Sequence, residues 1–171
     1  MIGLYPADGV ARALWIAPSE NAAPAGPSLS LDQWLQSEVR SGIATITSPL
    51  FEALVPQMLN YESVGGVNFK KGCYPGQEIV ARSQFRGTLK RRAYLANSQE
   101  AMKAGDEIFH SADASQPCGV VVQAAPSSKG GWDAIVSMQI AASQDGSVTL
   151  KSGDGPVLSI EPAPYPLLAD I

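Results

Sequence analysis

The sequence predicts an α+β fold, in which an α+β lobe over residues 1–87 precedes a small antiparallel β-barrel over residues 88–171. Three helix-like patterns lie before residue 88, whereas short strand-like segments separated by turn residues follow it. The composition agrees with a folded chain, because 45% of the 171 residues are hydrophobic and 16% are charged. We place the domain boundary near residue 88.

Local signals define the first part of the lobe. Residues 11–16 form a short strand-like run. Ser30 is the predicted N-cap of a helix, since Gln33 completes a capping box, and Gly42 is its predicted stop. A short helix can begin at Ser48, which precedes a proline.

The rest of the lobe is predicted as loop and strand over residues 56–76, followed by a helix over residues 76–85. Val67 and Phe69 alternate with polar residues, which is typical of a strand. Glu78 falls in the first turn of the helix, where a negative charge is favourable. Beyond the lobe we expect four β-rich segments: 89–96, 117–123, 132–140 and 147–160.

Charge is segregated along the chain. The net charge is −4, but residues 67–92 hold seven of the twelve basic side chains and only one acid, Glu78. A local excess of positive charge predicts a polyanionic ligand at this place. The alternative is that the basic side chains are paired with acidic neighbours.

Other features limit the class of protein. No apolar run is long enough to span a membrane, and no signal peptide is visible, which predicts a cytoplasmic protein without a membrane partner. Cys73 and Cys118 fit neither a disulfide framework nor a metal-ligand spacing, so no metal site is expected. A lone pair of distant thiols also cannot hold an iron–sulfur cluster permanently.

The segment with the strongest chemical signal is a glycine-bracketed loop that leads into the predicted helix. Gly72 and Gly76 allow the backbone to approach a ligand, and the first free amides of the helix form an anion site. A planar heterocycle that bears carboxylates would use every group here, although a phosphate or a nucleic acid could use the same parts. The polar and aromatic groups are Lys70, Lys71, Tyr74, Gln77, Arg82 and Arg86.

The residues themselves resemble a known family. Residues 71–78 read Lys-Gly-Cys-Tyr-Pro-Gly-Gln-Glu and are followed by Ala-Arg and Arg-Gly, which is similar to the signature of the YgfZ family. Upstream, Pro56-Gln57-Met58-Leu59-Asn60 resembles the Pro-Gln-x-x-Asn approach to that signature. The resemblance is specific over residues 30–92 and compatible with the remainder.

The resemblance implies a fold, a ligand and partners. Its fold is that of the glycine-cleavage aminomethyltransferase, so this chain would carry the carboxy-terminal part of a folate-binding lobe and then the β-barrel. The implied cofactor is tetrahydrofolate or a one-carbon derivative, and the implied partners are client enzymes of iron–sulfur cluster assembly or repair, including enzymes that modify transfer RNA. The implied pocket residues are Gln57, Asn60, Lys71, Tyr74, Gln77 and Arg82, with Cys73 as a reactive thiol.

Two departures from the pattern affect this interpretation. The resemblance covers only the carboxy-terminal half of the family, so a second chain would have to supply the amino-terminal half of the folate pocket. Pro56-Gln57-Met58 also lacks the carboxylate that the aminomethyltransferase carries there, which disfavours catalysis by this chain alone. The alternatives are an aminomethyltransferase-like one-carbon transferase and an RNA-binding module that uses the basic face of residues 82–92.

Overall fold

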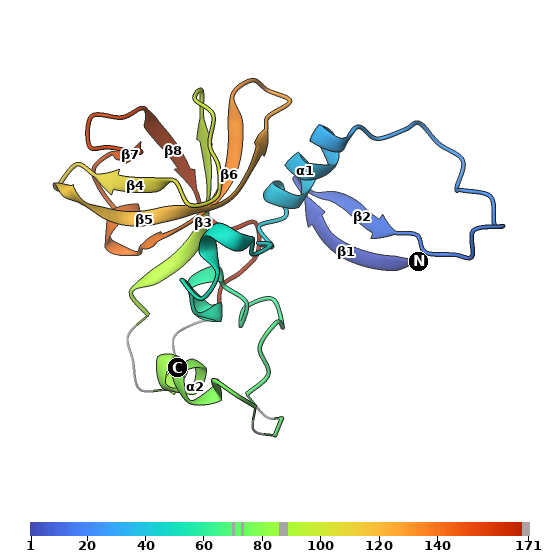
Figure 1. Ribbon diagram of the computed structural model, residues 1–171, viewed down its shortest axis with the longest axis horizontal. Coiled ribbons are helices and arrows are strands. Elements are labelled where there is room, and N and C mark those ends of the chain that lie inside the picture. Colours follow the sequence, from blue (N-terminus) through green and yellow to red (C-terminus); the bar gives the residue numbers. More distant parts are fainter. Residues whose placement is uncertain (70, 73, 86–88, 169–171) are drawn as a thin grey trace.

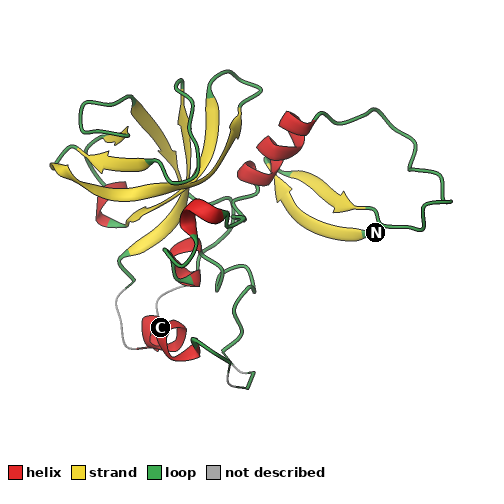
Figure 2. Cartoon of the chain, viewed as in Figure 1, coloured by secondary structure: helices red, strands yellow, loops and turns green. Residues whose placement is uncertain are grey.

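Six antiparallel strands close into a barrel in the second half of the chain (Figure 1, Figure 2). The computed structural model of the protein describes residues 1–69, 71–72, 74–85 and 89–168. Around the barrel the strand order is β3-β6-β5-β4-β7-β8, and β8 pairs with β3 to close it. The strands are β3 (Arg91–Ser98), β4 (Glu107–His110), β5 (Asp113–Pro126), β6 (Trp132–Gln139), β7 (Val148–Leu150) and β8 (Val157–Glu161). The predicted β-barrel is therefore confirmed.

One wall of the barrel is buried on both faces. In β6, Val136 packs into the barrel interior, whereas Ile135 packs on the outer face against the preceding part of the chain. Side chains alternate between the two faces of a strand, so a strand covered on both sides shows a continuous buried run rather than an alternating one. The outer cluster joins β3, β5 and β6 to Val39, Leu50 and Leu59.

Helix α1 (Leu31–Arg40) begins and ends where the sequence predicts. The Ser30 hydroxyl accepts from the Gln33 amide, and the Gln33 side chain accepts from the Ser30 amide, which completes the capping box. Gly42 follows with φ +71°, a conformation that favours glycine. The helix then lies beside β5 and β6, where Gln36 donates to Asp133 at 2.8 Å.

A two-stranded hairpin and several short turns precede the barrel. The strand predicted over residues 11–16 is β2 (Val10–Leu14), and it pairs with a strand that the sequence did not predict, β1 (Ile2–Ala7). Two 3-10 turns follow before the barrel, η1 (Ser48–Leu50) and η2 (Pro56–Leu59), and a third, η3 (Ala141–Ser143), lies between β6 and β7. The helix predicted over residues 76–85 is α2 (Gln77–Phe85), which lies away from the barrel (Figure 1).

One prediction of local structure was wrong, and a further strand was missed. Val67 and Phe69 are not in a strand, since residues 61–66 form turns and a bend, Val67 has no regular structure and Phe69 lies in a turn. Strand β4 was missed because its four residues are too few to show a periodic pattern. Neither helix of the described ranges has the length and apolar character needed to cross a bilayer.

Replacement of Gly42 by alanine should destabilise the fold by about 3 kcal/mol, since strain and a steric clash combine. An added Cβ would lie 2.7 Å from Pro164 Cδ and 2.9 Å from the Tyr165 ring, so the carboxy-terminal segment would have to move. Gly9 is a matched control, because its φ is +78° but an added Cβ meets nothing within 4 Å. Gly9→Ala should cost about 1 kcal/mol in urea unfolding, and equal costs for the two variants would contradict this packing.

Candidate functional site: a loop and helix held on the barrel wall

Residues 56–62, which we call the anchor segment, are fastened to the outer wall of the barrel. Asn60 is fully buried in a left-handed conformation, with φ 60°. Its side chain accepts from the Ala93 amide at 3.2 Å and donates to the Ala93 carbonyl at 2.9 Å. The neighbouring Met58 carbonyl accepts from the Ser137 hydroxyl at 2.9 Å. The anchor segment therefore binds both β3 and β6.

The same segment positions helix α2. Gln57 is fully buried, and its Nε2 donates to the Val80 carbonyl at 2.7 Å, in the middle of the helix. Val80 is buried in α2, whereas Ile79 beside it is exposed. The Gln57 Oε1 has no donor among the described residues and is closed off from solvent. Gln57 thus holds α2 from its buried side.

The loop before α2 presents a cation and an aromatic ring. The Lys71 ammonium lies 5.6 Å from the centroid of the Tyr74 ring, within the range of a cation–π contact. Tyr74 is half-buried and Lys71 is exposed. The Gln77 Oε1 accepts from the Tyr74 amide at 3.3 Å, which ties the loop to the first residue of the helix. Lys71, Tyr74 and Gln77 form one contiguous unit, which we call the loop–helix unit.

The remaining predicted site residues lie elsewhere. Arg82 is exposed and donates to Glu78 at 2.8 Å, one turn earlier on α2, rather than to the loop. Gln57 and Asn60 lie beneath the surface, where their side chains bind backbone groups of α2 and β3. Their role in a folate pocket stays a prediction. Cys73, like Lys70 and Arg86, lies outside the described residues.

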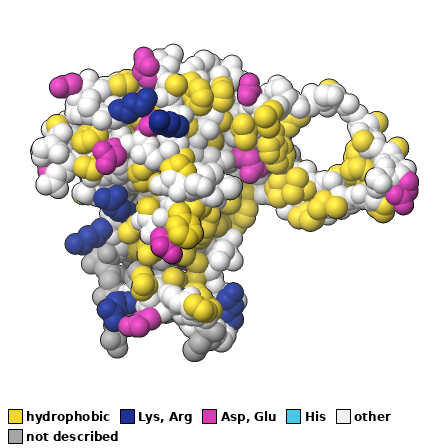
Figure 3. Space-filling model, in the orientation of Figure 1, with side chains coloured by type: hydrophobic (Ala, Val, Ile, Leu, Met, Phe, Trp, Pro, Cys, Tyr) yellow, Lys and Arg dark blue, Asp and Glu magenta, His cyan; other side chains and the backbone are white. Residues whose placement is uncertain are grey.

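Part of the basic run is neutralised inside the molecule. Arg92 forms an ion pair with Glu62, and their side chains are 6% and 0% exposed. Arg92 also donates to the Leu168 carbonyl at 3.3 Å. On the face seen in Figure 3, the coloured Lys and Arg side chains lie in small separate groups, and Asp and Glu side chains are scattered over the same face. Sequence reasoning missed Glu62, because nothing local indicates that it meets a residue thirty positions away.

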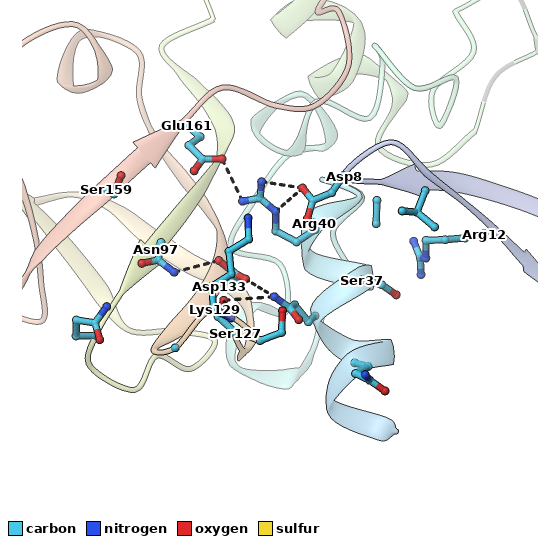
Figure 4. Close-up of a pocket in the computed structure, with 17 residues that line it drawn as sticks. Asp8, Arg12, Ser37, Arg40, Asn97, Ser127, Lys129, Asp133, Ser159 and Glu161 are labelled. Carbon is cyan, nitrogen blue, oxygen red and sulfur yellow. Dashed lines mark hydrogen bonds and ion pairs between the residues drawn. The ribbon is translucent and has the colours of Figure 1, made fainter. Parts of the chain in front are cut away.

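A polar hollow of about 450 Å³ lies between the hairpin, α1 and the barrel (Figure 4). Arg40 spans it, with contacts to Asp8 at 2.8 Å and Glu161 at 3.1 Å. Burial opposes the charge of Arg40, but these two carboxylates outweigh it and raise the Arg40 pKa. Asp133 accepts from both Gln36 and Asn97. These polar groups form hydrogen bonds and ion pairs with one another. Their contacts join the hairpin, α1 and the barrel.

The thiol that the structure describes is unsuited to chemistry. Cys118 is buried in β5 among the side chains of the barrel interior. Burial raises the pKa of the Cys118 thiol, which disfavours the reactive thiolate. Cys118 therefore has a packing role in the barrel interior.

The fold and the site together define a β-barrel protein that displays a cationic and aromatic loop–helix unit on a buried anchor. The sequence matches no protein-family model. It is 36% identical over 141 residues to the "tRNA-modifying protein YgfZ" of Enterobacter sp. (strain 638), a match that covers 79% of this chain and 42% of that protein. The protein of the same name from Edwardsiella ictaluri (strain 93-146) is 33% identical over 138 residues, or 78% of this chain and 41% of the relative.

A third relative matches a shorter stretch of this chain at a higher sequence identity. The "tRNA-modifying protein YgfZ" of Cronobacter sakazakii (strain ATCC BAA-894) is 42% identical over 78 residues, which cover 44% of this chain and 24% of the relative. The chain therefore belongs to the YgfZ family. It spans about two fifths of the length of the first two relatives.

The buried ion pair between Glu62 and Arg92 should contribute far more to stability than the exposed ion pair between Glu78 and Arg82. Glu62→Ala leaves the buried charge of Arg92 without its carboxylate and should cost about 3 kcal/mol or more. Glu78→Ala removes a pair whose side chains are 69% and 82% exposed and should cost less than about 0.5 kcal/mol. Urea unfolding of both variants measures the difference, and a cost below about 1 kcal/mol for Glu62→Ala would refute the anchor role.

Proposed function

We propose that this chain is the part of a YgfZ-family protein that binds a reduced folate, in support of iron–sulfur cluster assembly or repair in client enzymes of transfer-RNA modification. The observation that carries the proposal is the accessible Lys71–Tyr74 contact in a chain that belongs to this family. A cation beside an aromatic face suits a ligand that combines a planar ring with carboxylates.

The residues of the loop–helix unit fit tetrahydrofolate in their chemistry. Tyr74 offers a ring face for stacking, and Lys71 offers a charge for a glutamate carboxylate. Gln77 holds the Tyr74 backbone, so it acts as a positioning residue for the ring. Arg82 can bind a second carboxylate by exchanging its exposed contact with Glu78, which is a weak one. When bound, the folate would supply the capacity to carry a one-carbon unit.

Direct binding of RNA by residues 82–92 is the less well supported alternative. Arg92 is buried against Glu62, so this cation of the stretch already has an acidic partner and is withdrawn from solvent. Binding of a nucleic acid depends on exposed cations that meet phosphates. The relatives' printed name, which refers to modification of transfer RNA, agrees with action through client enzymes as well as with direct contact.

Calorimetric titration with tetrahydrofolate at physiological salt tests the proposal. Lys71→Ala should weaken binding by about tenfold, because it removes the charge that lies next to the ring face. Lys129→Ala is the control, since Lys129 is an exposed lysine in the turn between β5 and β6. It removes the same charge from the chain and should leave the affinity within about twofold, because a distant exposed charge is screened.

Two results would count against the proposal. The first is an equal loss for Lys71→Ala and Lys129→Ala, which would mean that only net charge attracts the ligand. The second is binding of transfer RNA with a steep salt dependence in the absence of any binding of tetrahydrofolate, which would favour the RNA-binding alternative.

A further inference from the structure

The polar hollow between the hairpin, α1 and the barrel keeps charged atoms that no contact within the described chain uses (Figure 4). Its volume of about 450 Å³ lies within the range of about 300–1,000 Å³ that is typical of sites for small ligands. Such sites occur preferentially where domains or elements meet. This hollow lies where the turn of the hairpin meets α1, the turn between β5 and β6, and β8. We call it the junction hollow.

Arg40 holds two carboxylates of the junction hollow, each by one oxygen. The Arg40 Nε donates to Asp8 Oδ1 at 2.9 Å, and the Arg40 Nη1 donates to Glu161 Oε2 at 3.1 Å. The second oxygen of each carboxylate, Asp8 Oδ2 and Glu161 Oε1, has no donor among the described residues. Both carboxylate side chains are about half exposed, whereas that of Arg40 is 17% exposed. A largely buried cation therefore fixes two carboxylates and leaves each able to accept a further hydrogen bond.

Lys129, in the turn between β5 and β6, brings a cation to the same hollow. Its side chain is exposed and forms no ion pair or hydrogen bond with the described residues. The other charges of the lining are already engaged, since Arg12 is paired with Glu38 and Asp133 accepts from two side-chain amides. The charged groups left for a ligand are thus two carboxylate oxygens and one ammonium.

The lining disfavours several classes of ligand. None of the seventeen residues drawn in Figure 4 is aromatic, so a pterin or a nucleobase would find no ring on which to stack. Three carboxylates line the hollow, those of Asp8, Asp133 and Glu161, and they oppose a phosphate or another polyanion. Apart from an alanine, a valine and a glycine the lining is polar, so a hydrophobic ligand would gain little from burial. A small polar ligand that carries both signs of charge fits these groups.

Three amide side chains of the lining add hydrogen-bonding capacity. The Gln33 side chain uses its oxygen in the capping box and keeps its Nε2 donors. Gln36 and Asn97 use their nitrogens as donors to Asp133 and keep their oxygens as acceptors. One unused donor group and two unused acceptors suit a ligand with a polar side chain, such as an amide.

We propose that the junction hollow binds a polar α-amino acid. The ammonium of the ligand donates to the unused oxygens of Asp8 and Glu161, and its carboxylate accepts from the Lys129 ammonium. The proposal does not depend on folate binding, because the loop–helix unit contributes no residue to the hollow. The glutamate part of a folate also lacks the ammonium, since its amino nitrogen lies in an amide bond.

Nuclear magnetic resonance titration of the ¹⁵N-labelled full chain with L-glutamine tests the proposal. Glutamine should shift the backbone amides of Asp8, Lys129 and Glu161, and the shifts should saturate by about 10 mM, because exposed charge pairs give a weak affinity. N-acetyl-L-glutamine lacks the ammonium, and L-glutaminamide lacks the carboxylate. Each should bind at least about fivefold more weakly. Shifts that do not saturate, shifts confined to other amides, or equal binding of the three compounds would overturn the proposal.

Two variants with matched controls locate the site. Lys129→Ala and Glu161→Gln should each weaken glutamine binding by about fivefold or more. Lys103→Ala and Glu107→Gln remove the same charges from exposed positions outside the hollow and should leave binding within about twofold, because distant exposed charges are screened. The Lys129 side chain has no contact that supports the fold, so its variant gives an answer even if Glu161→Gln loosens the junction. Equal losses for Lys129→Ala and Lys103→Ala would refute the location.

Discussion

The two hydrogen bonds between the Asn60 side chain and Ala93 are the constraint on which the placement of the anchor segment and of α2 depends. They satisfy the amide and the carbonyl of one residue of β3, and both partners are buried. A buried backbone group without a partner costs about 1–3 kcal/mol, so the pairing fixes where the anchor segment can lie. The Met58–Ser137 contact with β6 and the ion pair of Glu62 with Arg92 then complete a single attachment to the barrel.

The position of the loop–helix unit follows from this attachment. The Gln57 side chain binds the Val80 carbonyl and so links the anchor segment to the centre of α2. The Gln77 side chain binds the Tyr74 amide and so links the start of α2 to the loop. The chain thus supports an accessible ring and cation by means of buried amides. Gln57 and Asn60 of the Pro-Gln-x-x-Asn stretch are buried, whereas Lys71 is exposed. The barrel serves as the rigid support.

Local chemistry was predictable from the sequence, and long-range pairing was not. The capping box at Ser30, the stop at Gly42 and the start of α2 depend on residues within one turn of each other. The β-barrel was predictable from strand spacing. By contrast, Arg92 belongs to an obvious basic run, but its partner Glu62 comes from a different element. Gln57 and Asn60 were recognised as important, whereas their buried contacts depend on the position of β3 and α2, which no local pattern specifies.

Native-state hydrogen exchange at the Ala93 amide tests the anchor most directly. This amide donates to the Asn60 side chain, so its protection from exchange reports on the attachment of the anchor segment to the barrel. We expect the Ala93 amide to exchange as slowly as the amides of the central strand β6. Asn60→Ala should make the Ala93 amide exchange faster, while those β6 amides stay protected. Rapid exchange at Ala93 in the unaltered chain, or exchange that Asn60→Ala leaves unchanged, would contradict this attachment.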